Sequence, residues 1–192
     1  MYNIYAFFDI DKVEYHLIEK YLYLLPLERQ AKVCAYENEI DKINCILAYF
    51  LLMYGLKKGY GITDFQMDYS NYGKPYIKNN HNVFFNISHC KKACVCVISD
   101  SPIGIDVQEI GSIPIEVIDY CCTEHEKKYI EQSKNRDESF LKIWVMKESY
   151  LKMIGIGLRK EPKLLNVLDY EKKFKIIKEN DCYIAISENR LW

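Results

Sequence analysis

The sequence has almost no net charge and no long apolar run, and each absence excludes a class of function. Its 192 residues carry 26 basic and 27 acidic side chains, for a net charge of −1, which argues against general nucleic-acid binding. The longest apolar stretch, Cys45 to Tyr54, is far shorter than the roughly 20 residues that a membrane helix needs. Because charged residues already occur at Asp9 and Asp11, we expect no targeting or membrane segment, and the cytoplasm is the expected compartment.

Several familiar motifs are also missing. The eight cysteines form no Cys-x-x-Cys pair, so we interpret them as small hydrophobes in a reducing compartment rather than as a disulfide framework. A zinc site built from His89, Cys90, Cys94 and Cys96 is an alternative, but these spacings match no familiar ligand pattern. There is no Gly-x-x-x-x-Gly-Lys-Ser/Thr phosphate loop, which argues against a nucleotidyl or kinase-type enzyme.

The apolar pattern predicts an α+β fold. With 49% hydrophobic residues the chain can form one substantial domain or two closely packed half-domains. We predict strands at 2–10, 83–89, 93–98, 102–108, 174–177 and 182–187. We predict helices near 12–25, 27–36, 38–57, 114–120, 123–132 and 137–153. Gly59 and Gly61 are expected to end the third helix, and Gly155 and Gly157 the last.

The last predicted helix carries the most informative residues. Trp144, Lys147, Glu148 and Lys152 stand at i, i+3, i+4 and i+8 and therefore share one helical face. A carboxylate that can bind a metal ion, flanked by two lysines on one rigid helix, suits the binding of a polyphosphate. The alternative is a solvated Glu148–Lys152 ion pair, which stabilises a helix by only about 0.2–0.5 kcal/mol.

A second acidic position lies in the predicted strand 102–108. The side chains of this strand alternate, with Ile103, Ile105 and Val107 on one face and Gly104, Asp106 and Gln108 on the other. Asp106 is a carboxylate on an apolar strand, beside a glycine that lets another backbone approach. The alternative is that Asp106 simply faces water. One hairpin upstream, the strand 83–89 ends in the pair Ser88-His89.

Four ordered motifs resemble a known family. They are Tyr72-Gly-Lys-Pro75, Phe85-Asn-Ile-Ser-His89, Gly104-Ile-Asp106 and Trp144-x-x-Lys-Glu-Ser-x-x-Lys152. Together they resemble the 4′-phosphopantetheinyl transferases of the surfactin-synthetase-activating type, over about residues 25–158. The resemblance implies transfer of the phosphopantetheine arm of coenzyme A to a serine of an apo acyl or peptidyl carrier protein. It also implies release of 3′,5′-ADP and dependence on Mg²⁺, with Mn²⁺ as the other possibility.

The resemblance further implies a pseudo-dimer of two similar α/β halves with the active site in the cleft between them. The halves are expected at residues 1–105, which contribute the 3′-phosphate and adenine side of the coenzyme A site, and 106–192, which contribute the metal and the catalytic helix. A pseudo-dimer within one chain favours a monomer.

Roles at the reacting phosphates follow from the same resemblance. Asp106 and Glu148 are the expected magnesium ligands, with Gln108 at a third position where the family commonly has glutamate. Glu148 is the expected base for the carrier serine, directly or through a metal-bound water. Lys152 is expected to neutralise the leaving phosphate, and Lys147 to hold the pyrophosphate.

The matching residues for the nucleotide end of coenzyme A are Lys74, Ser88 and His89. Asn44 stands where the family commonly has an arginine for the 3′-phosphate, which predicts a less cationic pocket. Because Gln108 and Asn44 depart from the family pattern, the alternative is a catalytically silent relative that binds coenzyme A or a carrier protein. Carrier docking is expected on the apolar positions Ile113, Ile115, Val117 and Ile118, although their helix could equally bury them.

Overall fold

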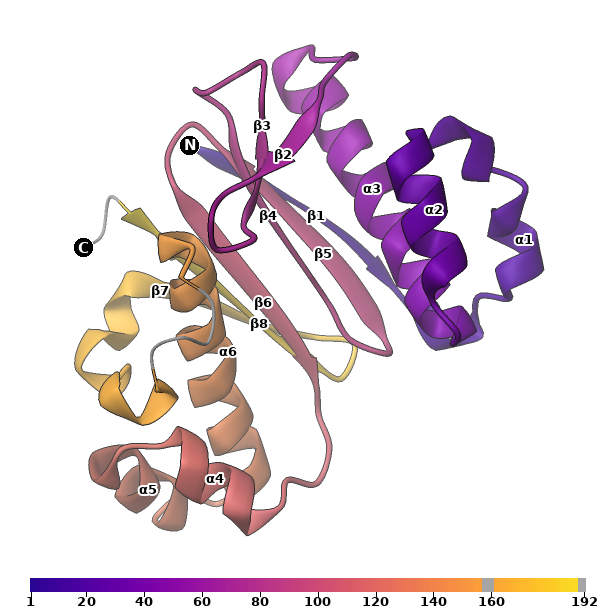
Figure 1. Ribbon diagram of the computed structural model, residues 1–192. Coiled ribbons are helices and arrows are strands. Elements are labelled where there is room, and N and C mark those ends of the chain that lie inside the picture. The colour runs from indigo at the N-terminus through magenta and orange to yellow at the C-terminus, as the bar shows by residue number, and fades with distance from the viewer. Residues whose placement is uncertain (157–160, 190–192) are drawn as a thin grey trace.

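The computed structural model describes residues 1–156 and 161–189 and has the predicted α+β composition. Two antiparallel three-stranded sheets have the strand orders β1-β5-β4 and β6-β8-β7, and β2 and β3 form a separate hairpin (Figure 1). The strands are β1 Tyr2–Phe8, β2 Met67–Tyr69, β3 Pro75–Ile77, β4 Phe84–His89, β5 Ala93–Ser99, β6 Ile103–Glu109, β7 Phe174–Glu179 and β8 Cys182–Glu188. The α-helices are α1 Tyr15–Glu19, α2 Leu27–Ala35, α3 Glu39–Tyr60, α4 Ile115–Cys121, α5 Glu124–Glu131 and α6 Arg136–Ile154. Short 3₁₀ helices are η1 Ile10–Lys12, η2 Leu22–Leu24, η4 Pro162–Leu164 and η5 Leu168–Lys173.

The two sheets pack against each other between two long helices. One face of β5 contributes Cys96 and Ile98 to a core with α3, and its other face packs Val95 and Val97 on β6 and β8. Helix α6 covers the outer face of the second sheet, as Figure 1 shows. The buried apolar alternation of β6, with Ile105 facing the first sheet, is the predicted one.

The sheets are also joined by hydrogen bonds from strand side chains. Asn86 Oδ1 of β4 accepts from the backbone N–H of Ile105 at 2.9 Å, and Ser88 Oγ accepts from that of Val107 at 3.3 Å. Two side chains on alternate positions of β4 thus replace the carbonyl groups that a neighbouring strand would offer. This arrangement holds Ser88 beside Asp106.

A glycine on β6 allows α6 to lie directly on the strand. A Cβ atom added to Gly104 would stand 1.9 Å from the carbonyl oxygen of Ser149 and 2.5 Å from the backbone nitrogen of Met153. Only glycine fits this approach, as the sequence suggested. Helix α6 then ends at Gly155, which has a positive φ of 76°; Gly157 lies outside the described residues.

The N-terminal helices differ most from the prediction. Instead of one helix over 12–25, the chain forms the short α1 and η2. Tyr15, Ile18 and Leu22 of these segments pack against the core only partly buried, and neither segment contains a fully buried residue that would anchor a longer helix. Helix α3 runs through Gly59 and ends at Gly61, whose φ is 67°.

The hairpin of β2 and β3 was not predicted, because its strands of three residues each are too short to show a pattern. The remaining predicted strands and helices are confirmed within a few residues, and the capping box of Thr123 and Glu126 is present. Among the described residues, none of the helices combines the length and the apolar character needed to cross a membrane.

Candidate active site

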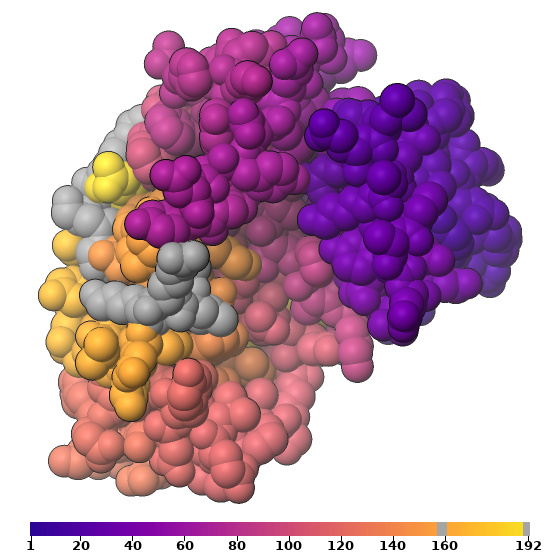
Figure 2. Space-filling model, viewed as in Figure 1, coloured from indigo at the N-terminus to yellow at the C-terminus, as the bar shows by residue number. Residues whose placement is uncertain are grey.

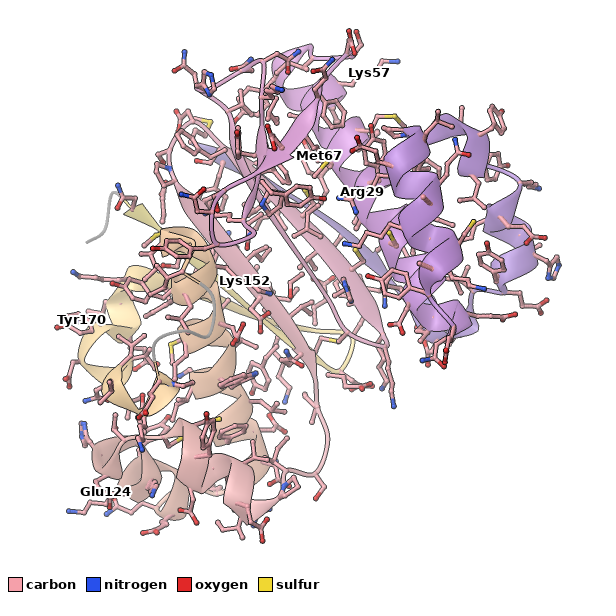
Figure 3. The ribbon with its side chains drawn as sticks, viewed as in Figure 1. Arg29, Lys57, Met67, Glu124, Lys152 and Tyr170 are labelled. Carbon is pink, nitrogen blue, oxygen red and sulfur yellow. The ribbon has the colours of Figure 1, made fainter. Side chains whose placement is uncertain are left out.

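Asp106 is the centre of a small polar cluster between β4, β6 and α6. Asp106 is 1% exposed, and its Oδ1 atom accepts a hydrogen bond from Ser88 Oγ at 2.7 Å. Lys152 Nζ lies 2.6 Å from the same oxygen and donates to Ser88 Oγ at 2.8 Å. Figure 3 shows Lys152 reaching from α6 toward the strands. Ser88, Asp106 and Lys152 of three different sequence motifs therefore meet in one cluster.

Glu148 lies one helical turn before Lys152 and belongs to the same cluster. Its Oε1 atom is buried and accepts no hydrogen bond from any described residue. Burial raises the pKa of Glu148, the charge of Asp106 raises it further, and Lys152 lowers it. A buried carboxylate oxygen without a partner, next to a second carboxylate, is an environment that a bound cation stabilises.

Gln108 adds a third oxygen atom on this side of β6 and α6 that could bind a metal ion. Its Nε2 atom donates to Asp106 Oδ2 at 3.4 Å, so the amide lies beside the carboxylate. Within residues 1–156 and 161–189, no three His, Cys, Asp or Glu side chains are grouped as metal ligands. Two carboxylates and an amide oxygen nevertheless fit Mg²⁺, a hard cation that prefers oxygen ligands and keeps several waters.

Lys147 does not reach this cluster, contrary to its predicted role with the pyrophosphate. Its side chain is fully buried, and Nζ lies 2.7 Å from Glu126 Oε2. It also donates to the carbonyl oxygens of Cys121, Pro162 and Leu165 at 2.7–2.9 Å. All three N–H donors are used inside the protein, so Lys147 ties α6 to its neighbouring segments and has none left for a phosphate.

Ser88 and His89 differ in their access to a ligand. Ser88 is buried and its hydroxyl is used by Asp106, Lys152 and Val107, so it positions the cluster instead of facing a nucleotide. His89 is exposed, and desolvation of its ring, followed by the charge of Lys152, lowers its pKa. Phosphate oxygens can therefore reach His89 but not Ser88 in this conformation.

Asn44 is buried beneath the end of β4. It is 3% exposed, and Nδ2 donates to the carbonyl oxygen of Cys90 at 3.4 Å. Asn44 thus supports the segment that carries His89, and its side chain does not reach the surface where a phosphate could bind.

Lys74 lies between the hairpin and the end of α6. Its Nζ atom donates to the carbonyl oxygen of Met153 at 2.7 Å and approaches that of Ile103 at 3.4 Å. Burial lowers the pKa of Lys74 to about 8. Lys74 and Lys152 both line a cavity of about 230 Å³, together with Asn86 and Gly155. The predicted cations of the two parts of the chain thus border one space.

A second cavity contains cations that the sequence analysis missed. It has a volume of about 610 Å³ and is lined by Arg29 and Lys32 of α2 and by Lys78 after β3. The contacts of the Arg29 guanidinium within the described chain include two hydrogen bonds to sulfur, from Nη1 to Cys45 and from Nη2 to Met67. Thiol and thioether sulfurs are weak acceptors. The only available sequence signal was the i,i+3 spacing of Arg29 and Lys32.

The elements that line these cavities, α2, the β2–β3 hairpin, β4 and α6, border a concave face of the molecule. Figure 2 shows this face hollowed between the N-terminal helices, in indigo, and the region of α6, in orange, with strand residues in pink at its floor. Lys32 lowers the pKa of His89 electrostatically, so the charge carried by α2 acts on the end of β4.

Part of the chain matches a known protein family. Residues 102–189, which include β6 and α6, match the family model of the 4′-phosphopantetheinyl transferase superfamily. These residues are therefore similar to that superfamily. The resemblance read from the motifs is thereby confirmed.

Individual 4′-phosphopantetheinyl transferases are similar over a longer part of the chain. The gsp transferase of Aneurinibacillus migulanus is 31% identical over 135 residues, 68% of this chain and 56% of the relative. A Bacillus subtilis transferase is 30% identical over 68% of this chain and 60% of its own length. The L-aminoadipate-semialdehyde dehydrogenase-phosphopantetheinyl transferase of Candida glabrata is 27% identical over 78% and 62%. The chain thus spans less than two thirds of the length of these relatives.

Proposed function

We propose that this protein transfers the 4′-phosphopantetheine arm of coenzyme A to a serine hydroxyl of an apo acyl or peptidyl carrier protein, releasing 3′,5′-ADP. The observation that carries the proposal is the convergence of Asp106 from β6 with Glu148 and Lys152 from α6, inside the segment that matches the family. The sequence similarity to several transferases extends beyond that segment, and this supports the same activity.

The proposal includes a magnesium ion held by Asp106 and Glu148, with Gln108 as a neutral third ligand. The unpartnered Oε1 of Glu148 and its proximity to Asp106 support this site. When bound, Mg²⁺ supplies charge neutralisation for the pyrophosphate oxygens. Gln108 contributes an oxygen but no negative charge, so we expect weaker metal binding than a third carboxylate would give.

The protein's own side chains carry the remaining steps. Glu148 takes the proton of the carrier serine. The serine oxygen forms a bond to the β-phosphorus of coenzyme A, and the bond from that phosphorus to the bridging oxygen breaks. Lys152 stabilises the negative charge that develops on the departing 3′,5′-ADP.

The nucleotide end of coenzyme A is proposed to bind along the hollow face. His89, Arg29 and Lys32 supply cationic or hydrogen-bonding groups for the 3′-phosphate, and Lys74 borders the cavity next to Lys152. The guanidinium of Arg29 now donates to sulfur atoms, which are weak acceptors. It can exchange these hydrogen bonds for stronger ones to phosphate oxygens.

We also propose that the chain is divided into two similar halves with the active site in the cleft between them, acting as a monomer. The presence of one long helix on one three-stranded sheet in each half supports this division. Because β6 pairs with β8 over its whole length, the boundary is better set before Ile103 than at residues 105 and 106. Exposed Ile115 and Val117 remain candidates for carrier docking, whereas Ile118 is buried.

The test is intact-mass analysis of several apo carrier proteins incubated with this protein, coenzyme A and Mg²⁺. The proposal predicts a mass gain of one phosphopantetheine group per carrier, equal release of 3′,5′-ADP, and loss of both with EDTA. Binding of coenzyme A by calorimetry without any transfer would identify a catalytically silent relative instead.

A further inference from the structure

Two cysteines from opposite halves of the chain face each other beside the proposed active site. Cys90 directly follows β4, and Cys182 is the first residue of β8. Their sulfur atoms are 3.9 Å apart although the residues are separated by 92 positions in sequence. All eight cysteines of the chain are free thiols in this structure.

The surrounding contacts hold the two turns that carry these cysteines together. Lys92, in the turn between β4 and β5, lies 3.5 Å from Asp181 in the turn between β7 and β8. Both turns lie at the same end of the sheets (Figure 1). The backbone N–H of Cys90 donates to the carbonyl of Ala93 at 2.8 Å, which fixes the turn at its base. The thiols therefore meet in a fixed setting rather than on mobile ends.

The chemistry of the pair is asymmetric. Cys90 is half-buried, whereas Cys182 is fully buried, so an external reagent reaches Cys90 first. A hydrogen bond from the Cys182 thiol lowers the pKa of Cys90 to about 7, although burial opposes this. The same interaction raises the pKa of Cys182. An accessible thiol with a lowered pKa next to a second thiol is the arrangement of a redox-sensitive pair.

We propose that Cys90 and Cys182 are a modification site for small disulfide oxidants of the glutathione type. The Cys90 thiolate attacks one sulfur of oxidised glutathione, forming a mixed disulfide and releasing one glutathione. Cys182 loses its proton and attacks the Cys90 sulfur, releasing the second glutathione and leaving an intramolecular disulfide. The two sulfurs must approach from 3.9 Å to a bond length of about 2.05 Å, a shift of roughly 2 Å.

The disulfide covalently joins the first sheet to the second next to the polar cluster. Cys90 adjoins His89 and lies two positions from Ser88, and its carbonyl oxygen accepts from Asn44. Drawing Cys90 toward β8 therefore displaces the segment that presents His89 to the hollow face. We infer that oxidation lowers transfer severalfold at limiting coenzyme A; this consequence rests on the proposed function.

The test of the disulfide is independent of activity. The full-length protein is incubated with oxidised glutathione, alkylated after denaturation, and examined by intact mass and non-reducing peptide mapping. Wild type is expected to lose the alkylatable thiols of Cys90 and Cys182 and to yield a Cys90–Cys182 linked peptide. Cys182→Ala is expected to keep one glutathione on Cys90, and Cys90→Ser to show neither product. Cys34→Ser, which removes an exposed cysteine far from the pair in sequence, serves as the control and should behave as wild type.

A glutathione adduct that persists on Cys90 in wild type would overturn the proposal, as would a linked peptide that contains another cysteine. If Cys182→Ala does not fold, Cys90→Ser still decides, because it must abolish the linked peptide. The functional consequence is tested by comparing oxidised, reduced and re-reduced wild type in the transfer assay. A mapped disulfide with an unchanged rate would refute the inhibition alone, and absence of transfer in every form would refute the proposed function while leaving the mapping valid.

Discussion

Lys147 Nζ lies 2.7 Å from Glu126 Oε2, and neither side chain is exposed to solvent. Glu126 also accepts hydrogen bonds from the backbone N–H groups of Thr123 and Val167. The pair thus connects α5, α6 and the segment after η4 in the interior of the second half. Lys147 belongs to the family-type motif by sequence, but its work in this structure is to hold α6 in place.

Replacing Lys147 with Met is predicted to destabilise the protein by about 3–5 kcal/mol, because it leaves the buried Glu126 charge uncompensated. Equilibrium unfolding in urea measures this loss. The double variant Lys147→Met, Glu126→Gln is expected to recover part of it, since the unpaired charge is gone. A Lys147→Met protein of unchanged stability that has lost only its affinity for coenzyme A would instead support the role predicted from sequence.

The sequence could not reveal this role of Lys147. Its four partners come from α5, the end of α4 and the segment after α6, which only the folded chain brings together. The helical spacing correctly grouped Glu148 with Lys152, because both positions depend only on the geometry of one helix. The alternation of β6 likewise predicted the face of Asp106, and Gly104 correctly indicated a close backbone approach.

Other misses have similar physical causes. The helix predicted over 12–25 is broken into α1 and η2, whose residues are at most partly buried against the core, and burial is a property of the whole fold. Arg29 of α2 borders the site because α2 lies beside the β2–β3 hairpin, where Arg29 contacts Met67. The strands of this hairpin are too short to be recognised in the sequence.

Replacing Gly104 with Ala is predicted to destabilise the protein by about 3 kcal/mol or more, because the added Cβ would collide with the backbone of α6. Thermal unfolding and transfer rate should both fall, since α6 carries Glu148 and Lys152. Gly111→Ala is the matched control, because a Cβ there meets no atom within 4 Å. Equal stability of the two variants would show that α6 does not depend on this close contact.

Replacing Glu148 with Gln is predicted to stabilise the protein in EDTA, increasingly so as the pH rises. The raised pKa of Glu148 means that the folded state holds this proton more tightly than the unfolded state does. The associated stability is fully present below the unfolded pKa of about 4.3 and is lost as the pH rises through the folded pKa, whereas Gln cannot ionise. We expect the gain in thermal midpoint to grow by about 1–3 °C between pH 4 and pH 8.

Glu131→Gln, at an exposed position of α5, is the control for this comparison and should follow wild type throughout. Adding Mg²⁺ should reverse the order by stabilising wild type but not Glu148→Gln. A pH-independent difference between Glu148→Gln and wild type would contradict the buried, unpartnered state of the carboxylate.

Replacing Gln108 with Glu is predicted to lower the Mg²⁺ concentration needed for half-maximal transfer by about tenfold, because a third carboxylate joins Asp106 and Glu148. In EDTA the same change should lower the thermal midpoint, since it adds a like charge beside Asp106 and Glu148. Glu109→Gln changes the neighbouring residue, whose side chain alternates to the other face of β6, and should leave the metal requirement unchanged. An unaltered requirement in Gln108→Glu would place position 108 outside the ligand set.

The most direct test of the account is the mass change of an apo carrier protein after incubation with coenzyme A, Mg²⁺ and either wild type or Glu148→Gln. We predict one phosphopantetheine group per carrier with wild type and a rate at least about 100-fold lower with the folded variant, as expected when the base and a metal ligand are lost together. Near-normal transfer by Glu148→Gln would remove this carboxylate from the mechanism and contradict the proposed site.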